Sequence, residues 1–220
     1  MICMVTDRRR LAAGDAASDR LVDLVWAAGR AGIDLVHVRE RDLNARYLVG
    51  LVRRCVAAVV GTRTKVVVND RADVAVAADA AGVHLRSDSI GAADARSLLS
   101  SGALIGRSVH DSEEAAAVAA AGGVDYFIFG TLHQTASKDP GHPIATFDAL
   151  RATCRAAAGI PVLGIGGMTV ERARDAARAG ASGIAGISLF VPPVGASADK
   201  HLQMVVASVR RAFDTSETVS

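Results

Sequence analysis

Short apolar runs alternate with longer helix-type runs along this chain, and the pattern repeats about eight times. Runs such as Val66–Val68 are continuously apolar, as in parallel strands that are covered on both faces. The strands are predicted at residues 2–6, 35–38, 65–69, 82–85, 104–106, 126–130, 162–165 and 183–187. The helices are predicted at about 17–30, 45–59, 71–79, 92–99, 112–122, 146–157, 170–179 and 198–213. Repeated strand–helix units favour a single-domain (β/α)8 TIM barrel over the alternative, an open doubly wound sheet.

Length and composition agree with one barrel. The 220 residues suit a single domain, which we predict to span residues 1–213, followed by a flexible C-terminal tail at 214–220. Half of the residues are hydrophobic but only 4% are aromatic. The core must therefore be built mainly from Val, Ile, Leu and Ala.

Charge and cysteine usage exclude several classes of protein. The net charge is +2 with both signs interspersed, and no basic stretch carries aromatic residues, so no nucleic-acid surface is expected. No apolar run is long enough for a membrane span, and no signal-peptide pattern is evident. Cys3, Cys55 and Cys154 are far apart and lack metal-ligand spacing. We expect a reducing, cytoplasmic location and, by default among symmetric assemblies, a homodimer.

Polar side chains stand at the end of nearly every predicted strand. In a (β/α)8 barrel these ends and the loops after them form the active-site face. The polar residues concerned are Thr6, Asp7, His37, Arg39, Glu40, Asn69, Asp70, Arg71, His84, Arg86, Asp88, Arg107, Ser108, His110, residues 131–138, and Ser188. So many polar strand ends predict one ligand site at this face.

A glycine pair, Gly166–Gly167, follows the strand at 162–165, and Ser188 follows the next strand. Backbone N–H groups on such turns are open to a ligand, and the last two loops of a barrel are the usual phosphate cradle. We predict that Gly166, Gly167 and Ser188 bind a phosphate. The alternative is a tight turn without a ligand.

Arg39 and Asp70 are candidates for an anion contact and a metal contact. An inward guanidinium needs an anionic partner, which is either a ligand or a carboxylate such as Glu40 or Asp70. A carboxylate at Asp70 can coordinate a divalent ion beside a phosphate. It can equally cap the helix that follows.

A set of motifs occurs in order from about Met4 to Phe190. They are Val5-Thr6-Asp7, Val38-Arg39-Glu40, Val68-Asn69-Asp70-Arg71-Ala72-Asp73, Gly82-Val83-His84-Leu85, Gly106-Arg107-Ser108-Val109-His110, the segment from Gly130 through Thr135-Ala136-Ser137-Lys138, and Ile165-Gly166-Gly167. Together they resemble the thiamin phosphate synthase/TenI superfamily. The resemblance implies a (β/α)8 barrel that handles thiazole phosphates.

The synthase branch of that superfamily joins hydroxymethylpyrimidine diphosphate to a thiazole phosphate, releases diphosphate and uses Mg²⁺. By resemblance, Asp70 would be a metal ligand. Arg39, Asn69 and Lys138 would hold the diphosphate substrate, and Thr135, Ser137, Gly167 and Ser188 the thiazole phosphate. The chain departs from that pattern, with His37 in place of glutamine, Arg41 in place of lysine, and Ser89 in place of the second metal carboxylate, one residue after Asp88.

The TenI branch tolerates serine at position 89, and it favours Ser-Val-His as in Ser108–His110. Its activity is thiazole tautomerisation, a proton shift that needs neither diphosphate nor a metal. We therefore prefer a thiazole tautomerase without a cofactor, acting on a thiazole phosphate. His110 would transfer the proton, with His37 as the second candidate. The alternative for His110 is a structural position near the start of a helix, with no part in the reaction.

Two other functions stay open at this stage. The first is thiamin phosphate synthase with Mg²⁺. The second is a non-catalytic regulator that binds thiazole phosphate. The long loop at residues 131–146 predicts a lid that brings Lys138 over the substrate.

Overall fold

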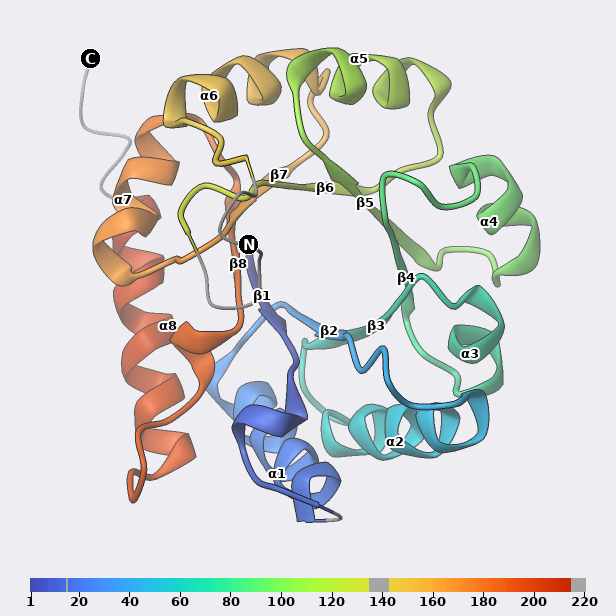
Figure 1. Cartoon of the computed structure of the whole chain (residues 1–220), viewed down its shortest axis with the longest axis vertical. Coiled ribbons are helices and arrows are strands. Elements are labelled where there is room, and N and C mark those ends of the chain that lie inside the picture. The colour runs from blue at the N-terminus through green and yellow to red at the C-terminus, as the bar shows by residue number, and fades with distance from the viewer. Residues whose placement is uncertain (15, 135–142, 215–220) are drawn as a thin grey trace.

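The computed structural model describes residues 1–14, 16–134 and 143–214. Within these residues, eight parallel strands pair in chain order and close into a barrel, which Figure 1 shows end-on. The strands are β1 (Ile2–Val5), β2 (Leu35–Val38), β3 (Lys65–Asn69), β4 (Gly82–Leu85), β5 (Leu104–Val109), β6 (Tyr126–Phe129), β7 (Val162–Ile165) and β8 (Gly183–Gly186). The predicted (β/α)8 TIM barrel is confirmed.

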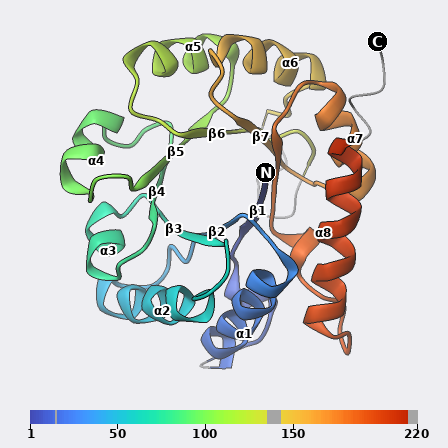
Figure 2. The same ribbon diagram turned by 180° about the vertical axis from the view of Figure 1, so that it is seen from behind.

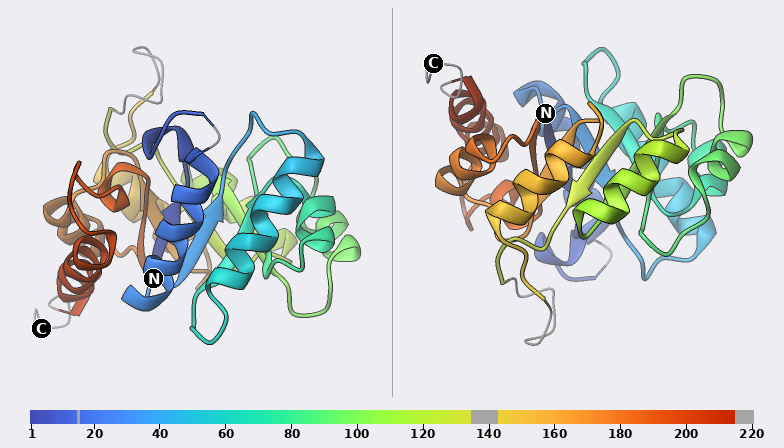
Figure 3. Two further views of the ribbon diagram at one scale, coloured as in Figure 1. Left: turned by 90° about the horizontal axis from the view of Figure 1, so that it is seen from below. Right: turned by 90° about the horizontal axis from the view of Figure 1, so that it is seen from above.

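Helices form an outer ring around the strands, as the front, rear and side views show (Figures 1, 2 and 3). They are α1 (Ala16–Ala31), α2 (Ala45–Ala58), α3 (Ala72–Ala77), α4 (Ala92–Leu98), α5 (Ser112–Ala121), α6 (Phe147–Ala156), α7 (Val170–Arg178) and α8 (Ala198–Asp214). Two short 3₁₀ turns, η1 (Arg8–Arg10) and η2 (Ser188–Phe190), follow β1 and β8. The ring closes where α8 packs against α1.

Side-chain caps explain where several helices begin. The side chains of Asn44, Asp111, Thr146 and Thr169 each accept a hydrogen bond from a backbone N–H in the first turn of the following helix. Such a cap contributes about 1 kcal/mol. These residues also aim the chain from the strand end into the outer ring, so they shape the loops at the active-site face.

β5 is longer than predicted. The sequence places its end at Gly106, but the ladder continues, with Arg107 opposite Leu85 and Ser108 opposite Ile128. Glycine interrupts the apolar run without interrupting the backbone hydrogen bonds, so the prediction stopped too early. Ser108 therefore belongs to the barrel wall and does not lie in the loop after it.

Two layers of apolar side chains form the core. The larger layer lies between strands and helices and includes Val36, Phe127 and Leu150. The smaller fills the barrel interior and includes Val67, Ile128 and Leu163. Aliphatic residues dominate both, as predicted, although Tyr126, Phe127 and Phe129 of β6 are among the largest fully buried side chains.

The chain's last helix and its cysteines complete the description. α8 runs through Asp214, and residues 215–220 lie outside the described part, so the predicted tail stays a prediction. Cys3, Cys55 and Cys154 are free thiols. Of the helices described, none has both the length and the apolar character needed to cross a membrane.

Candidate active site at the carboxyl ends of the strands

A cavity of about 700 Å³ opens at the carboxyl ends of the barrel strands. Every strand contributes to its wall, with Val5, His37, Asn69, His84, Ser108, Ile128, Ile165 and Gly186 from β1 to β8 in turn. Its size lies within the range of small-molecule sites. The structure thus brings together His37, Arg39, Asn69, His110, Gly166, Gly167 and Ser188, which the sequence singled out.

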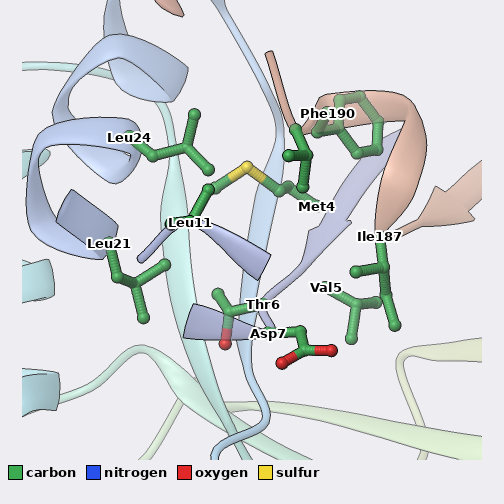
Figure 4. A pocket seen from close by; sticks show the side chains of 10 residues that line it. Met4, Val5, Thr6, Asp7, Leu11, Leu21, Leu24, Ile187 and Phe190 are labelled. Atoms are coloured by element: carbon green, nitrogen blue, oxygen red, sulfur yellow. The ribbon is translucent and has the colours of Figure 1, made fainter. Parts of the chain in front are cut away.

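A second gap beneath this face is much smaller. It holds about 10 Å³ and lies between β1, α1 and η2 (Figure 4). Met4, Leu21, Leu24 and Phe190 line it. Thr6 and Asp7 also line it, and a volume near that of one water probe has no room for a substrate.

Four arginines line the side of the large cavity formed by the β1, β2 and β4 loops: Arg10, Arg39, Arg41 and Arg86. Arg39 is partly buried, and burial together with the charge of Arg41 lowers its pKa. The backbone N–H of Arg39 donates to Thr6 Oγ1 at 3.0 Å, which fixes the end of β2. These charges favour an anion in the cavity.

The side chain of Arg39 has no carboxylate partner within 4.0 Å among the described residues. The two carboxylates considered for it are engaged elsewhere. Glu40 accepts from Arg8 Nη1 at 2.9 Å and from Thr6 Oγ1 at 2.6 Å. Asp70 accepts from Ser89 Oγ. The ion-pair alternative for Arg39 is therefore wrong, and its guanidinium is available to a ligand.

Asp70 lies in the turn after β3 with a left-handed φ of 63°. The N-cap of α3 is Arg71, and no side chain caps that helix, so the capping alternative for Asp70 is wrong. The turn presents the Asp70 carboxylate toward Ser89, and Arg86 Nη1 lies 4.0 Å from Asp70 Oδ2. Asp70 is thus not a helix cap, and it lines a smaller cavity of about 160 Å³ whose wall shares Asn69, Arg41 and Arg86 with the large one.

Asp88, the acidic residue next to Ser89 in the sequence, pairs with Arg86. Arg86 Nε donates to Asp88 Oδ1 at 2.8 Å, and Arg86 Nη2 donates to Asp88 Oδ2. Among the described residues, no group of three or more His, Cys, Asp or Glu side chains could hold a metal ion. Mg²⁺ is usually bound through one or two carboxylates plus substrate phosphates. The oxygen donors of Asp70 and Ser89 fit such a site, in which the ligand supplies the remaining oxygens.

The opposite side of the cavity is formed by the turns after β7 and β8. Gly166 and Gly167 adopt φ values of 111° and 57°. A Cβ at Gly166 would lie 2.7 Å from Leu132 N, and one at Gly167 would lie 2.9 Å from His133 Cβ. Only glycine fits here, and both glycines line the cavity, where backbone N–H groups can meet a phosphate.

Three histidines line the cavity. The ring of His110 is half exposed, and its Nδ1 lies 3.3 Å from Glu114 Oε2. His37 is buried, and burial and the charge of Arg39 lower its pKa to about 3. Asn69 lies beside His37 without reaching hydrogen-bonding geometry, so neither ring nitrogen of His37 is paired. His84 is buried 4.6 Å from His37, measured between ring centroids.

Some predicted residues lie outside the described part of the chain, namely Thr135, Ser137 and Lys138. Other residues of the cavity wall were missed as site residues. Arg10 lies in a run of three arginines that was not singled out, and Arg41 and Ser108 were noted only as a departure from the synthase pattern and as a strand-end residue. The sequence already placed Arg86 among the polar residues that follow the strands, and Arg41 would have joined them if every cation after a strand had been included.

The comparisons with known proteins agree with this geometry. The family model described as thiamine monophosphate synthase matches residues 2–190. The thiamine-phosphate synthase of Roseiflexus castenholzii is 38% identical over 191 residues, 87% of this chain and 81% of that protein. The thiamine-phosphate synthase of Natronomonas pharaonis is 40% identical over 177 residues, 79% of this chain and 81% of that protein.

A solved structure extends the match to three dimensions. Thiamine phosphate pyrophosphorylase from Pyrococcus furiosus superimposes with a TM-score of 0.77 and 26% identity, covering 98% of this chain and 96% of that chain. The sequence relatives are named synthases, which favours the synthase reading over the tautomerase reading preferred from the sequence. The chain belongs to the thiamine monophosphate synthase family, an enzyme family of thiamine biosynthesis.

Proposed function

We propose that this protein is a thiamine-phosphate synthase, which joins hydroxymethylpyrimidine diphosphate to a thiazole phosphate and releases diphosphate. One observation supports the proposal: a single cavity is lined by four arginines on one side and by the Gly166–Gly167 turn on the other. Two phosphorylated substrates require two regions that can bind phosphate, whereas tautomerisation of one thiazole phosphate requires one. The names of the sequence relatives support the same choice.

The separation of the two regions follows from the barrel order. β3 and β7 are four strands apart in either direction around the closed barrel. The arginine-lined region gathers around β3, with Arg39 after β2 and Arg86 after β4. The glycine pair follows β7 directly. A cavity of about 700 Å³ has room for two ligands between them.

The arginines would bind the diphosphate and stabilise its charge as it leaves the pyrimidine. Arg39 suits this role because its guanidinium is partly buried and unpaired, where electrostatic interactions are stronger than in water. Asp70 would hold Mg²⁺, with Ser89 beside it. When bound, Mg²⁺ neutralises charge on the departing diphosphate.

The thiazole phosphate would lie against Gly166, Gly167 and Ser188, where backbone N–H groups meet the oxygens. Thr135, Ser137 and Lys138 stay predicted ligands from the loop outside the described residues. The neutral state of buried His37 avoids repulsion with a pyrimidine cation formed beside it.

A coupling assay tests the proposal. The purified protein is incubated with both substrates and Mg²⁺, and thiamine phosphate and diphosphate are measured. We expect turnover that falls at least about 100-fold in Asp70→Asn, because several kcal/mol of charge stabilisation are lost. Asp19→Asn is the matched control, since Asp19 pairs with Arg54 on the outer ring of helices and lines none of the cavities described. No turnover in the wild-type protein would refute the proposal.

Thiazole tautomerisation is the second candidate, and Ser89 in place of a second carboxylate favours it. In that reaction His110, half exposed in the cavity wall, would move the proton. Conversion of the thiazole tautomer without the pyrimidine substrate, lost in His110→Ala and kept in Asp70→Asn, would identify it. Binding of thiazole phosphate without coupling or tautomerisation would indicate the non-catalytic regulator. Cytoplasmic location and a homodimer stay predictions.

A further inference from the structure

Gly106 of β5 leaves a space that two neighbouring side chains share. In the barrel register it stands opposite His84 of β4 on one side and opposite Tyr126 of β6 on the other. A Cβ at Gly106 would lie 2.1 Å from Tyr126 Cζ and 2.5 Å from His84 Nδ1. The missing side chain therefore lets His84 and Tyr126 meet across β5, inside the barrel.

These residues form a chain of hydrogen bonds that ends at the cavity. The Tyr126 hydroxyl lies 3.2 Å from His84 Nδ1, and His84 Nε2 lies 3.0 Å from Ser108 Oγ. Tyr126 is 1% exposed and His84 is 2% exposed. Ser108, two residues beyond Gly106 on the same face of β5, lines the cavity.

The direction of each bond follows from counting donors and acceptors. Among the described residues, His84 Nδ1 is the single hydrogen-bond partner of the Tyr126 hydroxyl. Burial raises the pKa of Tyr126, so the phenol keeps its proton and donates it to Nδ1. The reverse direction would leave a buried O–H without an acceptor, which costs free energy.

The protonation state of the His84 ring determines the direction of its hydrogen bond to Ser108. An imidazole whose Nδ1 accepts a hydrogen bond is neutral and carries a single proton. Because Nδ1 accepts from Tyr126, that proton is on Nε2 and is donated to Ser108 Oγ. The Ser108 hydroxyl already accepts a bond, and its own proton is free to point into the cavity.

We propose that Tyr126 and His84 are positioning residues that make Ser108 a hydrogen-bond donor to a phosphate oxygen of bound substrate. The identity of the substrates rests on the proposed function, and the donor direction does not. A phosphate oxygen is an acceptor without protons to donate, so it is the partner that a serine fixed as a donor prefers. The phosphate belongs to the diphosphate or to the thiazole phosphate.

The tautomer can be observed directly. In protein labelled with ¹⁵N at histidine, with His84→Gln to assign the signals, we expect His84 to show a protonated Nε2 and an unprotonated Nδ1. In Tyr126→Phe, which keeps the ring in the space beside Gly106, the preference for that tautomer should fall. A protonated Nδ1 at His84 in the wild-type protein would overturn the proposal. Tyr47→Phe, on the exposed face of α2, is the matched control.

Binding of simple anions gives a second readout. Calorimetry with inorganic diphosphate plus Mg²⁺, and separately with inorganic phosphate, should show about 10-fold weaker binding in Ser108→Ala for the anion that Ser108 contacts. Tyr126→Phe should weaken the same anion less, and Tyr47→Phe should weaken neither. Unchanged binding of both anions in Ser108→Ala would overturn the proposal. Neither measurement uses turnover, so a failed coupling assay would refute only the proposed function.

Discussion

Arg86 holds the carboxylate of Asp88 in a fork, with Nε 2.8 Å from Oδ1 and Nη2 donating to Oδ2. The same guanidinium lies 4.0 Å from Asp70 Oδ2, and the hydroxyl of Ser89 donates to the Asp70 carboxylate. Asp70 is therefore the one acidic side chain in this contact, among the described residues. A metal bound here would depend on the ligand for most of its negative charge.

Replacing Ser89 by aspartate should therefore strengthen metal binding. In Ser89→Asp the second carboxylate would lie beside Asp70, and the added charge should tighten Mg²⁺ by about 10-fold, equivalent to 1.4 kcal/mol. Calorimetric titration of Mg²⁺ in the presence of inorganic diphosphate measures this change. Ser89→Asn is the neutral control of similar size. Equal affinity in the two variants would show that position 89 does not reach the metal.

The buried histidine His37 should make stability fall in acid. Its pKa is lowered to about 3 in the folded state by burial and by Arg39. Between about pH 6.5, where histidine titrates in the unfolded chain, and pH 3, the unfolded state binds a proton that the folded state does not. The free energy of unfolding should then fall by at most about 1.4 kcal/mol per pH unit from this group.

Urea unfolding at pH 7.5 and pH 5 measures that dependence. His37→Gln should lose less stability between the two values than the wild-type protein does. His84 contributes in the same direction, because burial also lowers its pKa, so part of the dependence should persist. The control is His110→Gln, whose side chain is half exposed. An identical pH dependence in His37→Gln would contradict the assignment.

Glu40 should support the arginine side of the cavity through its buried contacts. Its carboxylate accepts from Thr6 Oγ1 at 2.6 Å and from Arg8 Nη1 at 2.9 Å, and Thr6 Oγ1 in turn accepts from Arg39 N. Glu40→Ala would leave the Thr6 and Arg8 donors without their acceptor and should lower the free energy of unfolding by about 3 kcal/mol. Asp42 pairs with the same Arg8, but its side chain is 39% exposed. Asp42→Asn should therefore lower the free energy of unfolding by under about 1 kcal/mol. Chemical denaturation compares the two, and equal costs would count against the network.

Gly167 should be required for phosphate binding beyond its effect on stability. Gly167→Ala places a Cβ 2.9 Å from His133 Cβ at a left-handed φ of 57°, which should distort the turn beside the cavity. We expect about 10-fold weaker binding of thiazole phosphate, the loss of roughly one charge-assisted hydrogen bond. Gly180→Ala is the matched control, because Gly180 also has a positive φ of 90° but its nearest atom is Cys154 Cβ at 3.7 Å. Binding should be unchanged there, and a similar loss in both variants would refute a phosphate role for Gly167.

The sequence predicted the barrel because each strand has its own apolar run and each helix its own start signal. Residues 35–38, 65–69 and 82–85 were predicted with the bounds that the structure shows. The end of β5 was missed because continuation past Gly106 depends on hydrogen bonds to β4 and β6, which no local pattern records. Local periodicity therefore determined the elements, and neighbouring strands determined one of their ends.

The site was predicted less completely than the fold. The strand-end rule brought His37, Arg39 and Asn69 to one cavity, since it depends only on topology. The partners of these side chains depend on tertiary geometry. No local pattern indicates that Arg39 is left without a carboxylate, since Glu40 is its neighbour in sequence yet pairs with Arg8. The chain of hydrogen bonds through His84 likewise needs three strands in register.

The placement of the arginine-lined side and the Gly166–Gly167 turn across one cavity has a consequence for inhibitor design. A molecule that carries a diphosphate mimic at one end and a phosphate at the other could span the barrel mouth and engage both regions together. Linking the two ends makes the second contact intramolecular, so such a compound would gain affinity from effective concentration without any new contact. A barrel whose mouth had only one cradle would give that compound no such gain.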